Sequence, residues 1–479
     1  MKMIAKIPLM LTYDDVLLVP QRSRVEHRAD ADTSTFLTKD LELKIPLISA
    51  NMDSVTEANM AIAMARAGGI GIIHRFMTIA DQVIQVDKVS RYESFLIENP
   101  YSIAPDKAIR FVLEKGRIND IHSYLVVDEH NKLLGLITRR DMIFQTDLSK
   151  KVSSLMTPLE KLITVKPGTS QDKIKKLFIK HKIEKLPVVD KAGIIKGLIT
   201  AKSIENHEQN PQASKDSSGR LLCGASVGVV GDFMERAEAL LNAYVSVLVV
   251  DVAHGQNQAS LNAIRKIRNA FPKARIIGGN VATAAGVRDL VKAGVDAVKV
   301  GIGPGGICST RTVTGVGVPQ LSAVMDCVEA AKGSKIKIIA DGGTNFPGDI
   351  VKALAAGASA VMLAGWFAGT EESPGSIITR KNKRYKIHRG SASFMSQADA
   401  SIRQGANKKL NAIVPEGVES LMEYKGTVSE IIYQLMGSLR SGMSYNNALT
   451  IKELQKNAKF IRITSAGFRE SLTHNINEI

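Results

Sequence analysis

Short apolar runs along the chain alternate with segments in which apolar residues recur at three- and four-residue steps. Continuous apolar runs are typical of strands buried on both faces of a parallel sheet, and the longer period is typical of helices. Glycine often closes the helical segments, as in 284–294. Eight β–α units in one chain favour a (β/α)8 TIM barrel over an open sheet. The predicted strands are residues 45–52, 69–75, 226–230, 245–253, 274–282, 297–303, 337–343 and 360–367.

A gap of about 150 residues follows the second predicted strand and contains an internal repeat. YLVVDEHNKLLGLIT (124–138) matches LPVVDKAGIIKGLIT (186–200), and an amphipathic helical stretch precedes each copy. Such a repeat indicates two similar units that bury a face against each other. It resembles a tandem pair of CBS domains. We therefore predict barrel segments at 1–92 and 207–479, and a CBS-domain pair at 93–206.

Each repeat ends with a threonine that is followed, three positions later, by another polar residue. In CBS domains a T-x-x-D sequence at this place often contacts a nucleotide ribose. The first copy has Thr138 and Asp141, whereas the second has Thr200 and Ser203. The resemblance therefore implies a regulatory purine nucleotide at Thr138 and Asp141. A repeat that serves only assembly is the alternative.

The chain is basic, with 63 Lys and Arg against 47 Asp and Glu. This charge fits phosphate-bearing ligands, although solubility explains it equally well. The basic residues are spread along the sequence without a nucleic-acid motif, so we expect no nucleic acid partner. No apolar run approaches a membrane span and no signal peptide is recognisable, so we expect no membrane association. Three cysteines without a C-x-x-C pair indicate a reducing compartment, and we expect a cytoplasmic protein.

A glycine-rich loop, GIGPGGICSTR (301–311), follows the sixth predicted strand. The active site of a (β/α)8 barrel lies at the C-terminal ends of its strands, so this loop is placed for chemistry. It can aim backbone carbonyls at a cation, N–H groups at phosphate and the Cys308 thiol at an electrophile. We predict that Cys308 is a nucleophile, with Thr310 beside it, and that Cys223 and Cys327 are buried small residues.

Polar residues also end the fourth, fifth and seventh predicted strands, at Asp251, Asn280 and Asp341. Each alone could be a helix N-cap, but three of them at strand ends favour a ligand site. Asp341 suits a ribose diol, because a carboxylate can accept hydrogen bonds from both hydroxyls. The segment 364–369 offers glycine N–H groups ahead of an expected helix, which predicts a phosphate cradle.

Taken together, these stretches resemble the IMP dehydrogenase/GMP reductase family over nearly the whole chain. The C-x-T sequence in its GPG context is highly specific. Further matching stretches are LTYDDVLLVPQRS (11–23), PLISANMDSVTEANMAIAMARAGGIGIIHR (46–75), VDVAHGQ (250–256), IIGGNVAT (276–283), TGVGVPQLSAV (314–324), IADGG (339–343), AGTEESPG (368–375), VPEGVE (414–419), YKGTVSE (424–430) and RITSAGFRES (462–471).

The resemblance implies roles for single residues. Cys308 would add to C2 of a purine mononucleotide, and Thr310 would help to transfer protons. Homotetramers are implied as well, which CBS pairs can join into octamers. The other implied roles are ribose binding by Asp341, phosphate binding by Gly343 and Gly365, recognition of the base edge by Glu416, cofactor binding by Asp251 and Asn280, and binding of a monovalent cation, usually potassium, by the carbonyls of Gly303, Gly305 and Cys308.

Several positions depart from the family pattern. Gly306 stands where a serine usually touches the phosphate, and Arg75 replaces the usual lysine after the second-strand histidine. The segment 389–394 reads RGSASF in place of R-G-M-G-S or G-M-S-S-E. A nucleotide-binding regulator on a barrel that has lost catalysis is therefore an alternative, although Cys308 and Thr310 favour an enzyme.

The family resemblance implies two reactions, and hydrolysis separates them. IMP dehydrogenase oxidises IMP with NAD and then hydrolyses the adduct to XMP, for which an Arg-Tyr pair on a mobile flap activates water. The flap expected here, within the loop-like region 381–426, has Arg403 followed by Gln404 in 396–413. GMP reductase, which releases ammonia from GMP and takes hydride from NADPH, does not need that pair.

We therefore predict a GMP reductase that uses NADPH, with the NAD-dependent IMP dehydrogenase as the alternative. The segment TGVGVPQLSAVMDC (314–327) also resembles the sequences of reductases more than those of dehydrogenases. Two features oppose this choice. Reductases carry a glutamate near position 394, where Phe394 stands, and many of them lack CBS domains.

Overall fold

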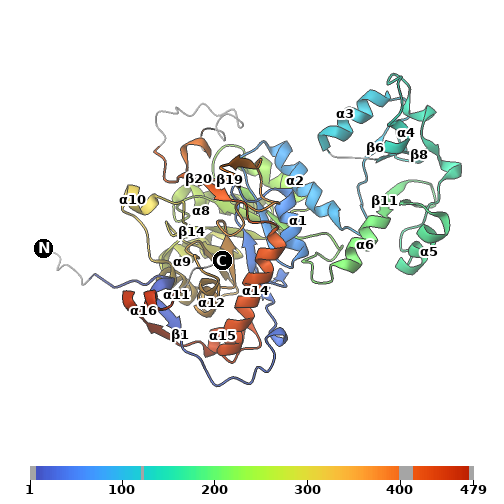
Figure 1. Ribbon diagram of the computed structural model, residues 1–479. Coiled ribbons are helices and arrows are strands. Elements are labelled where there is room, and N and C mark those ends of the chain that lie inside the picture. Colours follow the sequence, from blue (N-terminus) through green and yellow to red (C-terminus); the bar gives the residue numbers. More distant parts are fainter. Residues whose placement is uncertain (1–6, 120–122, 397, 399–413, 474–479) are drawn as a thin grey trace. The chain divides into compact units, whose positions relative to one another are not determined.

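The computed structural model describes residues 7–119, 123–396, 398 and 414–473. The chain forms two compact units, which are treated separately below (Figure 1). The first comprises Met1–Ser90, Gln212–Lys215 and Leu221–Ile479, and the second comprises Arg91–Pro211 and Asp216–Arg220.

The first unit is a closed barrel of eight parallel strands in the order β12-β13-β14-β15-β16-β17-β4-β5. The predicted (β/α)8 class is thus confirmed. Apolar side chains from all around the barrel, among them Ile48, Ile72 and Ile339, form its buried interior. The strands are β4 (Leu47–Ser49), β5 (Ile70–Ile73), β12 (Cys223–Val227), β13 (Val247–Asp251), β14 (Ile276–Val281), β15 (Ala297–Val300), β16 (Lys337–Asp341) and β17 (Ala360–Leu363).

One strand lies three residues earlier than predicted. The sequence pattern favoured 226–230, but β12 spans Cys223–Val227. Every residue of β12 is buried, whereas Val230 is 73% exposed. The small residues Cys-Gly-Ala at the start of β12 hid a strand whose packing needs little side-chain volume.

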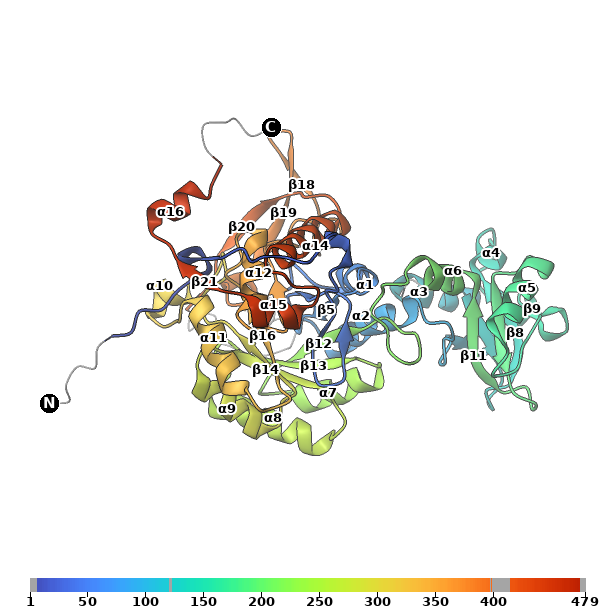
Figure 2. The ribbon, with the colours of Figure 1, turned by 90° about the horizontal axis from the view of Figure 1, so that it is seen from below.

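Helices surround the barrel strands, as Figure 2 shows for α7 to α9 and α11. Local sequence fixes their ends. The Thr283 side chain accepts from the Gly286 N–H at the start of α9, and Gly294 ends α9 at φ 105°, a conformation that glycine adopts at low cost. The helices are α1 (Ala58–Arg66), α2 (Ile79–Tyr92), α7 (Phe233–Asn242), α8 (Gln258–Ala270), α9 (Ala284–Ala293), α10 (Thr310–Thr314), α11 (Gln320–Ala331) and α12 (Pro347–Ala355).

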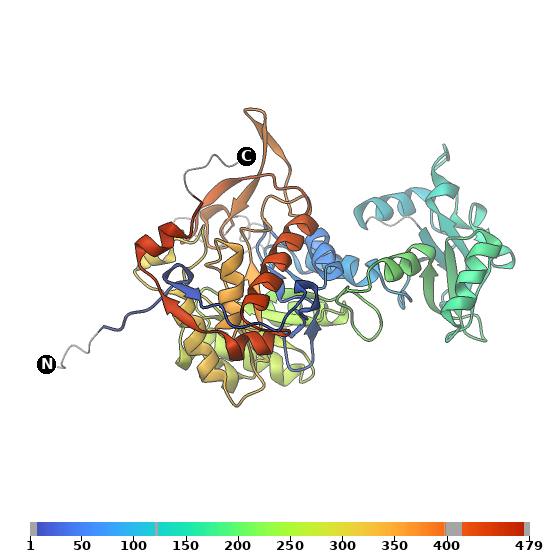
Figure 3. The same cartoon turned by 60° about the horizontal axis from the view of Figure 1, so that its bottom comes forward.

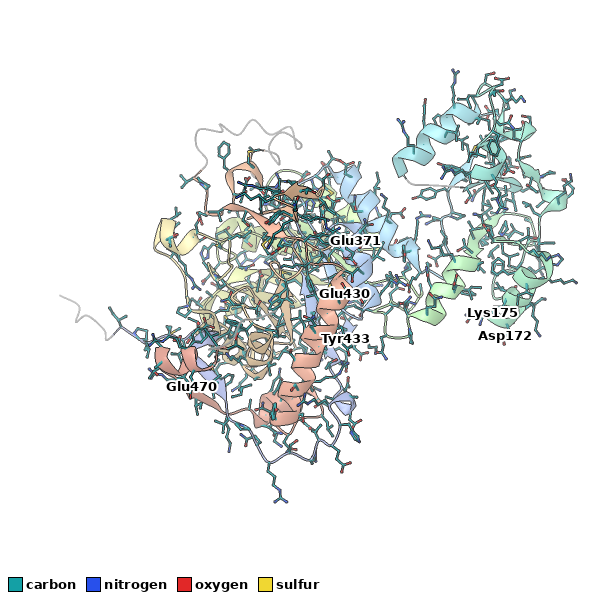
Figure 4. All side chains as sticks on the ribbon, viewed as in Figure 1. Asp172, Lys175, Glu371, Glu430, Tyr433 and Glu470 are labelled. Carbon is teal, nitrogen blue, oxygen red and sulfur yellow. The ribbon has the colours of Figure 1, made fainter. Side chains whose placement is uncertain are left out.

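Segments from the first and last parts of the described chain pair with each other in the barrel unit. Near the N-terminus, β1 (Val16–Leu18) pairs antiparallel with β21 (Phe460–Arg462), and Figure 3 shows the two side by side. A long helix, α14 (Val428–Tyr445), lies in the C-terminal part of this unit, and Figure 4 labels Glu430 and Tyr433 along it. Short elements complete this unit: β2 (Thr35–Phe36), β3 (Glu42–Leu43), α15 (Ile451–Asn457) and α16 (Ser465–Glu470).

Part of the region predicted to be loop-like, 381–426, forms a sheet instead. β19 (Lys383–Arg389) pairs antiparallel with β18 (Ile378–Arg380) and with β20 (Glu419–Glu423). The inward positions of β19 are polar, since Lys386 and His388 are buried while Ile387 is 46% exposed. This inverted pattern hid the strand from an analysis based on apolar periodicity.

The second unit contains the repeat. β7 (Ser123–Val127) pairs with β8 (Leu133–Thr138), and β10 (Lys185–Val189) pairs with β11 (Ile195–Thr200) in the same register. Leu125, Leu133 and Leu136 of the first copy share a buried cluster with Ile195 and Leu198 of the second. The copies therefore bury a face against each other, as the repeat predicted. Its identity as a CBS-domain pair stays a prediction.

The T-x-x-D sequence of the first copy caps a helix. The Thr138 N–H and hydroxyl both donate to Asp141 Oδ2 at 2.7 Å, at the start of α4 (Arg139–Met142). Thr200 and Ser203 also cap a helix, α6 (Ala201–Gln209): the Thr200 N–H donates to Ser203 Oγ at 3.3 Å, and the Ser203 N–H donates to Thr200 Oγ1 at 3.1 Å. Capping alone therefore accounts for these residue types, and the regulatory nucleotide at Thr138 and Asp141 stays a prediction. The other elements of this unit are β6 (Ser102–Ile103), α3 (Ile109–Asn119), β9 (Thr157–Pro158) and α5 (Gln171–His181).

Among the residues that the structure describes, no helix is long and apolar enough to cross a bilayer.

Candidate active site

The loops that follow the barrel strands enclose a cavity of about 710 Å³. Its position at the C-terminal ends of the strands is where barrel enzymes hold their substrates. Thr138 and Asp141 belong to the second unit and are not part of it. The sequence-predicted residues that line it are Asp251, Asn280, Gly303, Gly305, Cys308, Thr310, Asp341, Gly343, Gly365 and Glu416.

Cys308 is the exposed cysteine of the three, whereas Cys223 and Cys327 are buried. The Cys308 thiol donates to Thr310 Oγ1 at 3.2 Å, and the Thr310 hydroxyl donates to Glu416 Oε2 at 2.9 Å. This chain of donors leads from the sulfur to a carboxylate and can carry the thiol proton away. Burial raises the pKa of both Cys223 and Cys327 to about 12, so neither is a competing thiolate at neutral pH.

Glu416 reaches Cys308 although 108 residues separate them in the sequence. Backbone bonds fix the approach, because Ser309 N–H donates to the Glu416 carbonyl at 2.9 Å and Val418 N–H donates to the Ile307 carbonyl at 3.0 Å. The glycine-rich loop 301–311, which we call the nucleophile loop, is thus fastened to the segment before β20. Together the two segments form one wall of the cavity. The family resemblance pointed to Glu416, but the sequence spacing alone carries no signal for this contact.

A buried lysine organises the polar strand ends. Lys299 of β15 is 3% exposed, and its ammonium donates to Asp251 Oδ1 and to Asp341 Oδ2, each at 2.9 Å. It also donates to Asn280 Oδ1, while Asn280 Nδ2 donates to Asp341 Oδ2 at 2.9 Å. The sequence analysis missed Lys299, although a lysine inside the apolar run AVKVGIG was a visible signal.

The charges in this cluster stabilise one another. Burial by itself would raise the pKa of Asp251, but the neighbouring Lys299 outweighs burial and the pKa is lowered. Burial would likewise lower the pKa of Lys299, but Asp251 and Asp341 outweigh it and the pKa is raised. Asp251 and Lys299 are therefore charged at neutral pH, and the Lys299 ammonium holds the carboxylates of Asp251 and Asp341 in fixed positions.

Glycine allows the nucleophile loop to approach the strands. A Cβ at Gly301, where φ is 150°, would lie 2.1 Å from the Asp341 carbonyl oxygen. Gly306, which stands where the family has serine, is open, since no atom lies within 4 Å of an added Cβ. The departure at Gly306 therefore has no steric cause.

The structure also places Arg75 and Phe394, two other positions at which the sequence departs from the family pattern. Arg75 lines the cavity with its guanidinium 5.1 Å from the centre of the Phe76 ring. Phe394 is 43% exposed. Arg403 and Gln404 lie outside the described residues.

No helix begins directly after 364–369, because this segment turns back on itself with Phe367 N–H donating to the Ala364 carbonyl at 3.0 Å. The predicted phosphate cradle therefore lacks the helix that was expected behind it.

Comparisons with known proteins show to which family this chain belongs. A family profile described as "IMP dehydrogenase / GMP reductase domain" matches residues 10–474. The chain is 51% identical to an inosine-5'-monophosphate dehydrogenase from Nitrosopumilus maritimus, covering 97% of this chain and 98% of that protein. It is 50% identical to an inosine-5'-monophosphate dehydrogenase from Bacillus subtilis over 97% and 96% of the two chains. A solved structure of a cysteine-to-alanine variant of GMP reductase from Trypanosoma brucei, in complex with guanosine 5'-monophosphate, matches with a TM-score of 0.89 at 43% identity, covering 99% of both chains.

The prediction of a GMP reductase is wrong by these findings. Proteins about half identical to this chain over nearly their whole length are IMP dehydrogenases, and the reductase match is less similar. The prediction relied on the missing Arg-Tyr pair and on the resemblance of residues 314–327 to reductases. It overlooked another proton acceptor beside the sulfur, because Glu416 comes next to Cys308 only through the fold. From the family profile and these identities, the chain belongs to the IMP dehydrogenase/GMP reductase family.

Proposed function

We propose that this protein is an IMP dehydrogenase, which converts IMP, NAD and water to XMP and NADH. Membership of its family makes it an oxidoreductase that acts on purine mononucleotides. The observation that carries the proposal is the hydrogen-bonded chain Cys308–Thr310–Glu416 in the barrel cavity, in a protein about half identical to IMP dehydrogenases.

The first half of the reaction needs a sulfur nucleophile. The Cys308 thiol gives up its proton through Thr310 to Glu416, and the sulfur then adds to C2 of the purine. NAD, when bound, accepts the hydride that leaves C2. The purine is then held to Cys308 as a thioether at the oxidation level of the product.

The second half needs an activated water. Water attacks C2 of the thioether, the carbon–sulfur bond breaks and the thiolate leaves. A base must take the proton from this water, a contribution that is typically worth about 10²–10⁴-fold in rate. Once Glu416 has released the thiol proton to solvent, it can act through Thr310 as this base, since both side chains lie in a hydrogen-bonded chain with the sulfur. The proton taken from water then returns along the same chain to the Cys308 thiolate.

The charged cluster around Lys299 suits the ribose and the cofactor. Asp341 has one carboxylate oxygen bonded to Lys299 and Asn280, and the cavity that it lines is the place for a ribose diol. We assign Asp251 and Asn280 to the NAD side of the cavity. Their fixed positions orient the bound molecules before reaction, which lowers the entropic part of the barrier.

The nucleophile loop also fits a monovalent cation, which we take to be potassium. Among the described residues, the Gly303 and Cys308 carbonyls accept no hydrogen bond, which leaves them available as ligands. The Gly305 carbonyl already accepts from the Cys308 N–H at 3.0 Å, so it has one lone pair left to offer. A cation at these carbonyls would hold the loop in shape.

We further propose a cytoplasmic homotetramer, which the second unit can join into octamers.

A product assay tests the proposed function. Purified protein with potassium is given IMP plus NAD in one arm and GMP plus NADPH in the other, and nucleotides are separated by chromatography. We expect sustained formation of XMP and NADH in the first arm and no oxidation of NADPH in the second. Conversion of GMP to IMP with no XMP from IMP would refute the proposal.

The second unit is expected to be dispensable for catalysis. Replacing residues 93–206 by a short linker should leave kcat and KM for IMP within about twofold of the intact protein, because all eight barrel strands lie outside this segment. Any effect of purine nucleotides on rate or assembly should disappear, and Asp141→Ala in the intact chain should weaken it. A truncated protein that is well folded but inactive would contradict this modular view.

A further inference from the structure

Arg311 joins the two ends of the segment that carries the nucleophile. Its Nε donates to the Ile302 carbonyl at 3.3 Å, and its Nη2 donates to the Val318 carbonyl at 2.5 Å. Ile302 lies in the nucleophile loop before Cys308, whereas Val318 lies beyond the end of α10. One side chain thus spans the whole segment that contains Cys308 and Thr310.

Two glycines make room for this side chain. A Cβ added at Gly303, where φ is 77°, would lie 2.5 Å from Arg311 Cγ, and one added at Gly317 would lie 2.6 Å from the same atom. Non-bonded carbon atoms pack at about 3.5–4.0 Å, so a larger residue at either position would displace the arginine. The chain therefore provides a fitted slot for Arg311 against the nucleophile loop.

The short helix α10 depends on Arg311 for its position. Figure 1 shows α10 at the periphery of the barrel unit, and none of its residues is buried, so packing does little to fix it. Its backbone is closed by the Gly315 N–H, which donates to the Arg311 carbonyl at 3.1 Å. The Arg311 side chain then ties this helix to the segments before and after it.

Thr310, the first residue of α10, is the middle member of the hydrogen-bonded chain from Cys308 to Glu416, which we call the relay. Its hydroxyl oxygen lies 3.2 Å from Cys308 Sγ and 2.9 Å from Glu416 Oε2. Both distances are near the limits of a useful hydrogen bond, so a shift of about 1 Å in α10 would break one of them. The relay therefore requires α10 to be held in place.

We propose that Arg311 is a positioning residue for the relay, and that its guanidinium keeps Thr310 within reach of the Cys308 sulfur by joining the two carbonyls. In the described part of the chain Arg311 does not line the cavity, so it acts through Thr310 and not on the purine. The inference rests on the proposed function only for the reaction that the relay serves.

A guanidinium suits this task better than another cation. Two nitrogens of one rigid, planar group donate to the two carbonyls, so the spacing of the carbonyls is fixed by the group itself. An ammonium is a single flexible point donor and cannot impose that spacing. We therefore expect the relay to require the guanidinium fork, and positive charge alone to be insufficient.

Steady-state kinetics and binding give the first test. Arg311→Ala should lower kcat for XMP formation by about a hundredfold, because a displacement of about 1 Å in the reacting groups has an effect of this size. Trp366 is the single tryptophan of the chain and lines the cavity, so its fluorescence reports binding of IMP. The Kd for IMP should stay within about twofold, since Arg311 does not contact the cavity.

Alkylation of the nucleotide-free protein by iodoacetamide tests the relay without turnover. Mass spectrometry identifies the labelled thiol, and Cys308 is the exposed cysteine whereas Cys223 and Cys327 are buried. Arg311→Ala should slow labelling of Cys308 by at least about fivefold, because Thr310 no longer accepts the thiol proton from a fixed position. This measurement needs no purine and is therefore independent of the proposed function.

Chemical rescue distinguishes positioning from general damage to the fold. Ethylguanidinium replaces the atoms that Arg311→Ala removes. It should raise kcat of the variant by about tenfold and return labelling of Cys308 to within about twofold of the unaltered protein. Ethylammonium, which has the same charge without the fork, should restore neither rate.

Arg268→Ala is the matched control. The Arg268 guanidinium also joins two carbonyls, those of Gly294 at 2.9 Å and Ala274 at 2.7 Å, but these precede β15 and β14 and lie at the barrel end opposite the cavity. This variant should be less stable and keep both rates. The inference would be overturned if Arg311→Ala kept both rates, if ethylguanidinium had no effect, or if Arg268→Ala lost both rates equally. Slower labelling with rescue, in a protein that forms no XMP, would refute the proposed function alone.

Discussion

Cys308→Ala should lower kcat for XMP formation by at least about three orders of magnitude, because Cys308 is the one cysteine among the described residues that line the cavity and the proposed thioether needs its sulfur. Cys308 is exposed and its sulfur makes one hydrogen bond, to Thr310. The fold should therefore be unaffected, and the melting temperature should stay within about 1 °C of that of the unaltered protein. IMP should still bind, as seen from Trp366 fluorescence.

The matched control is Cys327→Ala. Cys327 is buried in α11, away from the cavity, and its thiol is too strongly protonated to act as a nucleophile. The variant should lose about 1 kcal/mol of unfolding free energy for the small cavity and keep its kcat. Retention of more than a few per cent of activity in Cys308→Ala, with full purity shown by mass spectrometry, would rule out the covalent mechanism.

Lys299→Met should damage both stability and catalysis. Methionine keeps most of the volume but leaves Asp251 and Asp341 without their shared cation, and removing one partner of a buried charged set costs about 3–5 kcal/mol. Loss of the fixed carboxylates should lower kcat/KM for IMP by about a hundredfold or more. Urea denaturation and steady-state kinetics measure the two effects.

The pH dependence of Lys299→Met distinguishes the charge effect from poor packing. In the unaltered protein the pKa of Asp251 is lowered, so its contribution to stability is present above about pH 4, the unfolded value, and is lost as the pH falls through the folded value. In the variant, burial is opposed only by Arg75 and Asn51, so the pKa of Asp251 should rise, and the stability deficit should be greatest at pH 7 and smaller at pH 5. A deficit that does not change with pH would indicate packing alone.

Lys292→Met provides the control for this pair of measurements. Lys292 is exposed on α9, so its substitution should change the unfolding free energy by less than about 0.5 kcal/mol at either pH. Its kinetic constants should equal those of the unaltered protein. An effect as large as that of Lys299→Met would show that loss of any lysine charge matters.

Sequence periodicity predicted the barrel because its strands are buried on both faces and read as continuous apolar runs. It failed where the buried residues of a strand are polar or small. Lys386 and His388 are polar residues on the inner side of β19, and small residues begin β12. In both places the packing that selects a strand comes from distant segments, which no local window contains.

In the candidate site as well, the residues recognised from the sequence were those with a distinctive local environment. Cys308 and Asp341 were recognisable because each ends a strand or sits in a loop with a distinctive local composition. Lys299 was visible in the sequence but its meaning depended on two carboxylates from other strands. The choice between two reactions failed for the same reason, because the hydrogen-bonded chain from Cys308 through Thr310 to Glu416 forms only when the segment before β20 meets the nucleophile loop.

The most direct test of the proposed reaction is to run it in water enriched in heavy oxygen. IMP and NAD are supplied to the potassium-loaded protein, and XMP is analysed by mass spectrometry while NADH is followed by absorbance. Attack of water on a Cys308 thioether predicts XMP with one heavy oxygen per molecule and one NADH for each XMP. Sustained NADPH oxidation by GMP, with no labelled XMP formed from IMP, would contradict the account.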